Sequence, residues 1–337
     1  MKDKKIVIVS MNGMRSVGGV ERVVYYLNQI LSEKYEVKII ERKKTFGKFD
    51  LIIWPVLFSF KLIFIRNKIV ISQSWQSFLY PVDFSIHHGT TRGFTNKVKE
   101  AKSFGSTIIS LFEKISAYTA KKILSVSENC KNELVKLYKT NQKKIIVLNN
   151  FVDENQFYPI KNNKTVHSLN LTLLFSGRLE NRKGFQELKV LSDYIENLEG
   201  VRLIIACPNS ENSQYFKNKK NTILHIGLKF NQMNEFYNKG NVFVFPTKYE
   251  GFSMATLEAL SCGCCVLGTS AAIPQELSNY DFAVVPKDFT PETIVSEAEK
   301  LMNDFKDRKD EIHKTITENF GYAQYKQKLM TIIESRV

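Results

Sequence analysis

Two glutamates, Glu250 and Glu258, stand eight residues apart just after the short apolar run 241–246, which ends in proline. The run is typical of a buried parallel strand, and the segment after it of a helix. With about 3.6 residues per turn, the two carboxylates would share roughly one helical face, about 12 Å apart. One carboxylate could then meet a hexose and the other a ribose. In the alternative, Glu250 caps the helix and Glu258 is a solvated helix residue.

The expected helix begins near Ser253, and the residues at its entry are Gly251, Phe252 and Ser253. Small residues at a helix start let backbone N–H groups approach an anion, and the helix dipole favours negative charge there. The segment therefore predicts a site that a diphosphate would fit.

A second apolar run, 171–176, ends in Gly177 and Arg178, and Lys183 follows five residues later, before another expected helix. Arginine offers a planar fork of donors and lysine a compact charge, so together they suit a diphosphate. Either residue alone could be an ordinary surface charge. Their position favours binding, because ligands of open α/β sheets bind at the carboxyl ends of strands.

The first part of the chain repeats the pattern of strand and helix. Residues 5–10 are expected to form a strand, and Gly18 and Gly19 open a helix; the pair is a weak phosphate signal, and the chain has no GxGxxG motif. Further on, His87 and His88 end an apolar strand. A histidine there could bind a sugar hydroxyl or an acceptor, or serve as a structural imidazole bonded to the backbone.

These segments together resemble glycosyltransferase family 4, retaining enzymes with the two-domain GT-B fold, and the resemblance covers nearly the whole chain. The motifs that carry it are Gly18-Gly19-Val20-Glu21, Ser125-Val126-Ser127, residues 147–153, Gly177-Arg178-Leu179 with Lys183-Gly184, and the pair Glu250 and Glu258. One departure is Phe151, which stands after Asn150 where many relatives have glycine.

The resemblance implies an α/β protein of two Rossmann-like domains that face each other across a cleft. Residues 1–160 would bind the acceptor and residues 161–320 the nucleotide-sugar donor. A helix within 321–337 would cross back to the first domain. The polar stretch 159–170 is where the sequence itself suggests the break.

The resemblance also implies roles for single residues. Arg178 and Lys183 would bind the donor diphosphate, and Glu258 would hold ribose hydroxyls. Glu250 is similar to the glutamate near the transferred sugar. Residues 251–253 would contact phosphate or sugar through their amides, and Gly19 would approach from the other domain. His88, immediately before Gly89, matches the family's histidine. The candidate catalytic residues are Glu250, His88, Arg178 and Lys183.

The expected activity is transfer of a hexose with retention from a nucleotide-diphosphate sugar, a UDP-sugar, to a glycan, either lipid-linked or a cell-surface polysaccharide. A retaining glycosidase is not expected, because its two catalytic carboxyls stand about 5 to 5.5 Å apart. The expected separation of Glu250 and Glu258 is about 12 Å. No cofactor and no metal is expected, because the sequence lacks a DxD motif and Cys262, Cys264 and Cys265 do not have zinc spacing. The alternatives are a sugar-nucleotide epimerase and a non-catalytic subunit that binds another glycosyltransferase.

Charge is concentrated in the first part of this chain of 337 residues with net charge +14. Residues 1–150 contain 26 Lys and Arg against 11 Asp and Glu, which leaves 22 against 23 for the remainder. An anionic acceptor or membrane surface is therefore an expected partner. Nucleic acid is not, because no recognised nucleic-acid module appears.

Two segments are candidates for membrane contact. Residues 96–122 mix lysines with apolar residues, as a basic amphipathic helix would, and 51–65 is strongly apolar. Neither reaches the roughly 18 to 20 apolar residues that span a bilayer, and both could instead pack in the core. The apolar run near the N-terminus is too short for a signal peptide. The five cysteines lack the spacing of a disulfide framework, which agrees with a reducing compartment. We therefore expect a cytoplasmic protein, peripheral on the inner face of the cell membrane.

Overall fold

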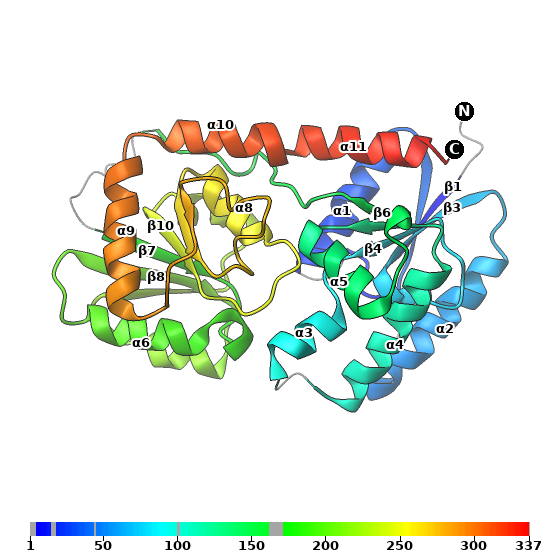
Figure 1. Cartoon of the computed structure of the whole chain (residues 1–337), viewed down its shortest axis with the longest axis horizontal. Helices are drawn as coiled ribbons and strands as arrows, with labels where there is room; N and C mark the ends of the chain where they lie inside the picture. The colour runs from blue at the N-terminus through cyan, green and yellow to red at the C-terminus, as the bar shows by residue number, and fades with distance from the viewer. Residues whose placement is uncertain (1–4, 15–17, 44, 100–101, 162–170, 337) are drawn as a thin grey trace. The chain divides into compact units, whose positions relative to one another are not determined.

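The structure is a computed structural model that describes residues 5–14, 18–43, 45–99, 102–161 and 171–336. It divides into two compact units, one of residues 1–150 with 325–337 and the other of residues 151–324 (Figure 1). Each unit is a parallel sheet covered by helices. The predicted α/β class is confirmed.

Unit 1 contains one parallel six-stranded sheet in the order β2-β1-β3-β4-β5-β6. Its strands are β1 (Lys5–Val9), β2 (Glu36–Ile40), β3 (Lys68–Gln73), β4 (Phe84–His87), β5 (Lys122–Ser125) and β6 (Ile145–Val147). Its helices are α1 (Gly19–Ser32), α2 (Asp50–Ile63), α3 (Thr91–Lys97), α4 (Phe104–Thr119) and α5 (Glu128–Tyr138), with short 3-10 turns η1 (Gly47–Phe49), η2 (Ser74–Ser77) and η4 (Gln142–Lys144).

Unit 2 contains a second parallel sheet, in the order β12-β11-β10-β7-β8-β9. Its strands are β7 (Leu171–Ser176), β8 (Val201–Cys207), β9 (Thr222–Ile226), β10 (Val242–Phe245), β11 (Cys265–Gly268) and β12 (Ala283–Val284). Its helices are α6 (Phe185–Ile195), α7 (Met233–Tyr237), α8 (Met254–Ser261), α9 (Pro291–Phe305) and α10 (Lys309–Phe320), with 3-10 turns η5 (Asn181–Lys183), η6 (Glu211–Phe216) and η7 (Phe230–Gln232).

The central strands of unit 2 are buried on both faces, as their apolar sequence predicted. All four residues of β10 are fully buried, although successive side chains of a strand point to opposite faces. Both faces are therefore covered, and β10 packs against α8 and α9. Continuous apolar runs are what such strands require.

The last helix, α11 (Tyr322–Glu334), lies mostly in unit 1, as expected of a helix that returns to the first domain. Two exposed ion pairs join it to the end of α1: Lys326 with Glu33 at 2.7 Å, and Lys34 with Glu334 at 2.5 Å.

The observed division falls between Asn150 and Phe151, whereas the sequence placed the domain boundary after residue 160. The backbone N–H groups of Tyr158 and Ile160 donate to Asn234 and Asn238 of unit 2, at 3.1 and 2.8 Å. These bonds hold the segment on unit 2. Residues 162–170 of the expected linker lie outside the described part of the chain.

The two segments considered for membrane contact are both helical in part. Residues 51–65 lie almost wholly in α2, which continues through Pro55. The single helix expected across 96–122 is wrong: α3 ends at Lys97 and α4 begins at Phe104, with Ser103 as its N-cap. No helix in the described ranges is long and apolar enough to cross a membrane.

Candidate active site

The strand order of unit 2 brings the two predicted phosphate motifs together. β7 lies next to β10, with β8 and β9 on one side and β11 and β12 on the other. This is the arrangement of dinucleotide-binding folds, in which ligands bind outside the carboxyl ends of the strands where the order reverses. The segments that follow β7 and β10 meet there: the N–H of Lys248 donates to the carbonyl of Arg182 at 2.8 Å.

Lys183 and Glu250 form a close ion pair at this point, with 2.6 Å between Nζ and Oε1. Their side chains are only 16% and 14% exposed, so the pair is largely shielded from water. Burial lowers the pKa of Lys183 below that of an ordinary lysine, and the Glu250 carboxylate opposes this shift. Thr247 Oγ1 also donates to Glu250 Oε1, at 2.8 Å.

Arg182 was not predicted from the sequence as a site residue. Its guanidinium lies 3.3 Å from Glu250 Oε1 and donates to the carbonyl of Tyr249 at 3.1 Å. By contrast, the side chain of Arg178 is 62% exposed and pairs with Glu180 at 2.9 Å. The structure therefore places Arg182, rather than Arg178, in contact with Glu250. Only the adjacency of Arg182 to Lys183 could have suggested this from the sequence.

Gly184 allows the two segments to approach closely. Its φ is +89°, and a Cβ at this position would lie 2.3 Å from Pro246 Cγ and 2.7 Å from the Pro246 carbonyl oxygen. Both the backbone conformation and the contact require glycine.

The helix that follows β10 begins where the sequence predicted, near Ser253. Helix α8 starts at Met254, and its N-cap is Ser253, whose Oγ accepts from the N–H of Thr256 at 3.1 Å. Glu250 therefore lies in the preceding loop, so the prediction of a shared helical face about 12 Å apart is wrong, and Glu250 does not cap the helix. Lys183, Arg182 and Thr247 hold its carboxylate instead.

The segment that leads into α8 packs against α10. Gly251 is half-buried, and the ring of Phe252 is buried against Phe320 of α10, with 5.7 Å between centroids. The side chains of Phe252 and Ser253 are therefore both engaged within unit 2.

Glu258 is 4% exposed, so it is not a solvated helix residue. Its Oε2 accepts from the hydroxyl of Tyr237 at 3.1 Å, and that hydroxyl lies 2.8 Å from Ser176 Oγ at the end of β7. Tyr237, also missed in the sequence, connects Glu258 to the carboxyl end of the sheet. A buried carboxylate with such a partner is held in a defined orientation.

In unit 1 the two adjacent histidines have different surroundings. His87 is fully buried, within 3.3 Å of Ser74 Oγ and 3.1 Å of Ser85 Oγ, and burial lowers its pKa to about 3. His88 is half-buried; its Nε2 lies 2.8 Å from Gln73 Oε1, and burial lowers its pKa to about 4. His87 is thus a structural imidazole, and His88 is the histidine that a ligand can reach.

Gly19 begins α1, directly after the segment that follows β1. A Cβ at Gly19 would meet nothing within 4 Å, so its backbone is open on that side. Nearby, Asn12 Nδ2 donates to Glu21 Oε1 at 2.8 Å, which holds the first turn of α1 against the end of β1.

The cysteines of 262–265 are buried packing residues, as the sequence suggested. Cys262 Sγ lies 3.1 Å from Asn234 Oδ1, and Cys264 Sγ donates to the carbonyl of Tyr237. Among the residues with described positions, no three His, Cys, Asp or Glu side chains could hold a metal ion.

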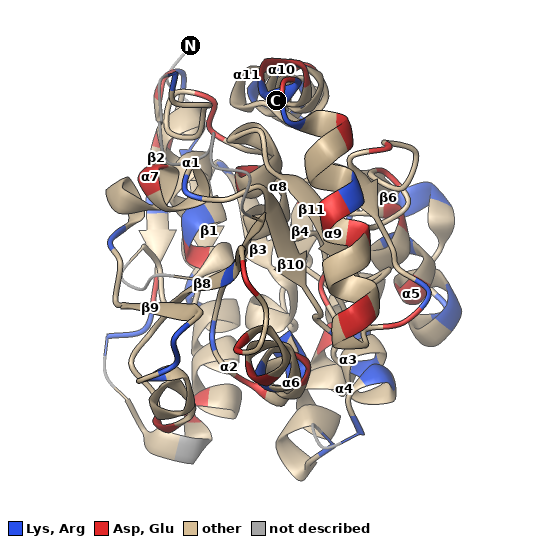
Figure 2. Cartoon of the chain, turned by 90° about the vertical axis from the view of Figure 1, so that its left-hand side faces the viewer, with Lys and Arg blue, Asp and Glu red and all other residues tan. Residues whose placement is uncertain are grey.

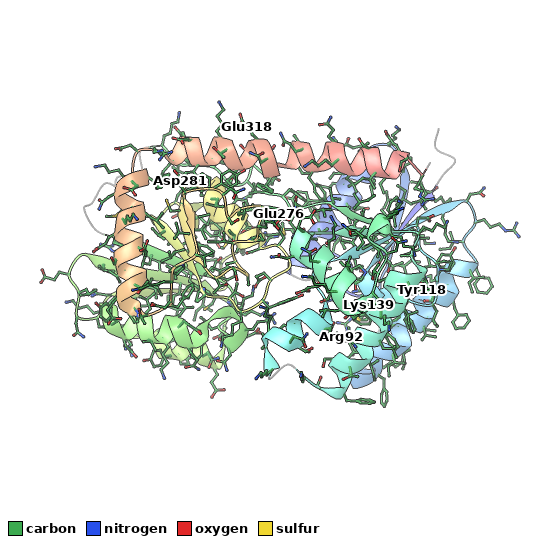
Figure 3. All side chains as sticks on the ribbon, viewed as in Figure 1. Arg92, Tyr118, Lys139, Glu276, Asp281 and Glu318 are labelled. Atoms are coloured by element: carbon green, nitrogen blue, oxygen red, sulfur yellow. The ribbon has the colours of Figure 1, made fainter. Side chains whose placement is uncertain are left out.

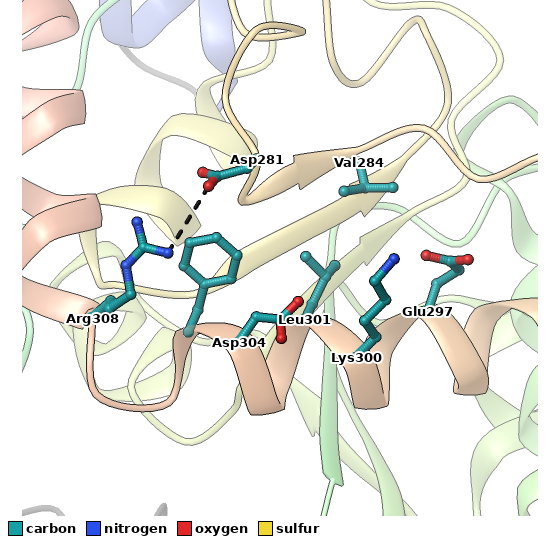
Figure 4. Close-up of a pocket in the computed structure, with 8 residues that line it drawn as sticks. Asp281, Val284, Glu297, Lys300, Leu301, Asp304 and Arg308 are labelled. Carbon is teal, nitrogen blue, oxygen red and sulfur yellow. Dashed lines mark ion pairs between the residues drawn. The ribbon is translucent and has the colours of Figure 1, made fainter.

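A separate pocket of about 480 Å³ lies along α9 (Figure 4). Its charged lining includes Asp281, Lys300 and Arg308, and Figure 2 shows mainly acidic residues along this helix. None of the predicted site residues lines it. The candidate site is the loop region after β7 and β10.

Comparison with known proteins identifies relatives of the chain. Residues 170–304 match the family model described as glycosyl transferases group 1. The chain is 30% identical over 236 residues to the capsular polysaccharide biosynthesis glycosyltransferase CapM of Staphylococcus aureus, a match that covers 64% of this chain and 60% of that protein. The chain thus spans less than two thirds of this relative.

Two solved structures share the architecture of nearly the whole chain. Sucrose-phosphate synthase from Thermosynechococcus elongatus superposes with a TM-score of 0.79 at 13% identity over 98% of both chains. The Anabaena protein HepE, in complex with UDP and glucose, has a TM-score of 0.75 at 12% identity over 98% of this chain and all of its own. These likenesses concern the fold. Residues 170–304 therefore belong to the group 1 glycosyltransferases, and the chain has the GT-B fold.

Proposed function

We propose that the protein is a retaining hexosyltransferase that moves a hexose from a UDP-sugar to a glycan acceptor, either lipid-linked or a cell-surface polysaccharide. One observation carries the proposal: the largely shielded pair of Lys183 and Glu250 lies at the strand-order reversal of unit 2, in the loops that lead to α6 and α8. A cation next to a helix N-terminus is suited to a diphosphate.

The reaction requires stabilisation of a leaving group rather than a protein nucleophile. The bond between the anomeric carbon and the phosphate oxygen breaks, and negative charge grows on the diphosphate. Fixed donors stabilise that charge in the transition state. Lys183, Arg178 and the amides of 251–253 would supply them. The acceptor oxygen bonds to the anomeric carbon on the same face, and its proton passes to the departing phosphate oxygen.

The other candidate residues would orient the substrates. Glu258, held by Tyr237, would accept hydrogen bonds from the ribose hydroxyls of the donor. Glu250 would contact the hexose, and Lys183 would then bridge Glu250 and the diphosphate. In unit 1, Gly19 and His88 would contact the substrates, His88 as a neutral imidazole because burial lowers its pKa to about 4.

The names of the relatives support the substrate classes. The Staphylococcus aureus relative is named for capsular polysaccharide biosynthesis, and the HepE structure contains UDP and glucose. We extend these to the present chain as a UDP-sugar donor and a polysaccharide-related acceptor. The reaction as proposed uses no metal, and the protein would act in the cytoplasm on acceptors at the inner face of the cell membrane.

The test measures melting temperature and hydrolysis for a panel of nucleotide sugars in metal-free buffer. The correct donor at about a hundred times its Kd stabilises by about 2.7 kcal/mol, which corresponds to about 5 to 10 °C for a unit of this size. Glu258→Gln should remove this shift. The matched control is Glu318→Gln on α10, whose exposed side chain lies 3.9 Å from Lys314 (Figure 3); it should keep the shift.

The outcomes separate the alternatives. Transfer of a labelled hexose to a lipid-linked acceptor extract supports the proposal. A donor that changes its sugar configuration without transfer would indicate an epimerase instead. If no donor stabilises the protein and none is cleaved in the presence of the extract, the non-catalytic subunit replaces the transferase.

A further inference from the structure

The outer sides of α2 and α4 in unit 1 expose large apolar side chains. On α4, Phe104, Leu111 and Tyr118 are 83%, 55% and 83% exposed. Their spacing of seven residues places them along one line of the helix, with a drift of only about 20° per step. Tyr118, near the C-terminal end of α4, is labelled in Figure 3.

Helix α2 is apolar on its outer side as well as its inner side. Pro55, Phe58 and Leu62 are buried in unit 1, whereas Phe60 and Phe64, at the C-terminal end of the helix, are 55% and 82% exposed. A helix that is hydrophobic all round is normally buried or in contact with lipid.

The two helices are neighbours. Both pack against η2. A Cβ built on Gly105, near the start of α4, would lie 3.7 Å from Leu51 Cδ1 of α2. Next to η2, Phe78 stacks on Phe112 of α4 with 3.9 Å between ring centroids, and the N–H of Leu79 donates to Ser59 of α2 at 3.3 Å. Phe60, Phe64, Phe104, Leu111 and Tyr118 therefore form one surface, which we name the α2–α4 face.

The exposed charges that the structure describes on the segments around this face are positive. The exposed cationic side chains there are Lys61, Arg66, Lys97, Lys99, Lys102 and Lys114. In the described ranges 50–99 and 102–122 the acidic residues are Asp50, Asp83 and Glu113, and none of them is exposed. Asp83 pairs with Lys121 at 2.8 Å, and Glu113 accepts from Thr91 and Tyr138.

We propose that the α2–α4 face is a docking surface for the anionic surface of a lipid bilayer, with the aromatic and aliphatic side chains in the interface and the lysines at the headgroups. Interfacial helices combine these two features. The fourteen residues of α2 are about 21 Å long, shorter than the roughly 30 Å hydrocarbon core, so the helix would lie on the membrane.

A second copy of the chain is a poorer occupant of this face. A symmetric dimer through the same surface would set the lysines of one copy near those of the other, and such like-charge contacts are unfavourable. The proposal concerns where the protein binds. It is independent of the sugar-transfer reaction.

The test is co-sedimentation of the full-length protein with vesicles of phosphatidylcholine alone, or of phosphatidylcholine mixed with phosphatidylglycerol. The wild type should bind the mixed vesicles and lose binding in about 1 M salt, where the Debye length is about 3 Å. Phe64→Ser combined with Phe104→Ser should weaken binding by about tenfold or more. Lys102→Glu combined with Lys114→Glu should weaken it by at least about fivefold per lysine.

The matched controls lie in unit 2. Val190→Ser replaces a 54% exposed apolar residue of α6, and Lys306→Glu reverses an exposed lysine. Both should bind like the wild type. All four replaced residues of the test variants are exposed, so their melting temperatures and their turnover of a soluble acceptor should be unchanged.

Three results would overturn the proposal: failure of the wild type to bind anionic vesicles, equal binding by wild type and test variants, or equal loss in the controls. Sedimentation velocity without lipid adds a fourth. A wild-type dimer that both test variants dissociate would assign the face to a second copy of the chain.

Discussion

Lys183 and Glu250 are 67 positions apart in the chain, yet Lys183 Nζ lies 2.6 Å from Glu250 Oε1. The contact joins the loop after β7 to the loop after β10, and Arg182 and Thr247 reach the same oxygen. It is the point at which the two sequence motifs become one site. The lysine is held in place before a donor arrives, so little side-chain ordering remains for binding.

Replacement of Lys183 tests its role as the cation for the diphosphate. Lys183→Met should lower kcat/KM by about 100- to 1000-fold, the range found when a donor to a developing anion is removed. Burial lowers the pKa of Lys183 below the value of 10.5 for an ordinary lysine. As the pH rises, kcat/KM of the wild type should therefore begin to fall before pH 10.5, because the ammonium loses its proton.

Lys183→Arg provides the control for this alkaline limb. Arginine keeps its proton throughout the range, so the variant should lack the limb even if its turnover is lower at neutral pH. An identical alkaline limb in Lys183→Arg would show that another group is responsible.

Tyr237→Phe should disturb Glu258 without touching the substrate directly. The hydroxyl that is lost bonds Glu258 at 3.1 Å and Ser176 at 2.8 Å, both in buried surroundings. We expect a loss of about 1 to 3 kcal/mol in the free energy of unfolding, and a higher donor KM with little change in kcat. Urea unfolding and steady-state kinetics measure these. If kcat falls and KM is unchanged, Tyr237 does not act through donor binding.

Gly184→Ala should destabilise unit 2 more than an alanine at another glycine with positive φ. At Gly184 the added Cβ would clash with Pro246, whereas at Gly227, with φ of +71°, it would meet nothing within 4 Å. Both variants carry backbone strain of about 1 to 3 kcal/mol, and overpacking adds about 1 to 3 kcal/mol at Gly184 alone. The comparison of Gly184→Ala with Gly227→Ala in urea isolates the clash. Equal losses would mean that Pro246 moves aside at no cost.

His87 should make unit 1 sensitive to acid. Its pKa is about 3 in the folded state and 6.5 in the unfolded state, so the unfolded state binds more protons between these values. The free energy of unfolding therefore falls as pH is lowered from 6.5, by up to about 1.4 kcal/mol per pH unit. His88, with a pKa of about 4, adds to this down to that pH.

His87→Gln should make the free energy of unfolding less dependent on pH below 6.5, by the contribution of one proton, up to about 1.4 kcal/mol per pH unit. The chain has two tryptophans, Trp54 and Trp75, and both lie in unit 1, so their fluorescence follows this unit during urea unfolding. His225→Gln in unit 2 is the control and should leave the tryptophan transition unchanged. An unaltered slope in His87→Gln would mean that the acid sensitivity has another source.

The sequence alone determined the features that depend on local patterns. Apolar runs such as 171–176 and 242–245 predicted buried parallel strands, and β7 and β10 have these positions. Gly177 and Lys183 followed one strand and Glu250 the other, which predicted a binding site at the carboxyl ends of these strands. The concentration of positive charge in residues 1–150 was also readable directly. Such features need no knowledge of which strands become neighbours.

Which side chains meet depends on how the strands and helices pack in three dimensions. The adjacency of β7 and β10 follows from the strand order of the whole sheet, and it pairs Lys183 with Glu250. The turn η5 directs Arg182 inward, while Arg178 pairs with Glu180 at the surface. The burial of Glu258 beneath Tyr237 depends on helix packing. Contacts over such distances in the chain leave no local pattern, because each partner is supplied by a different strand or helix.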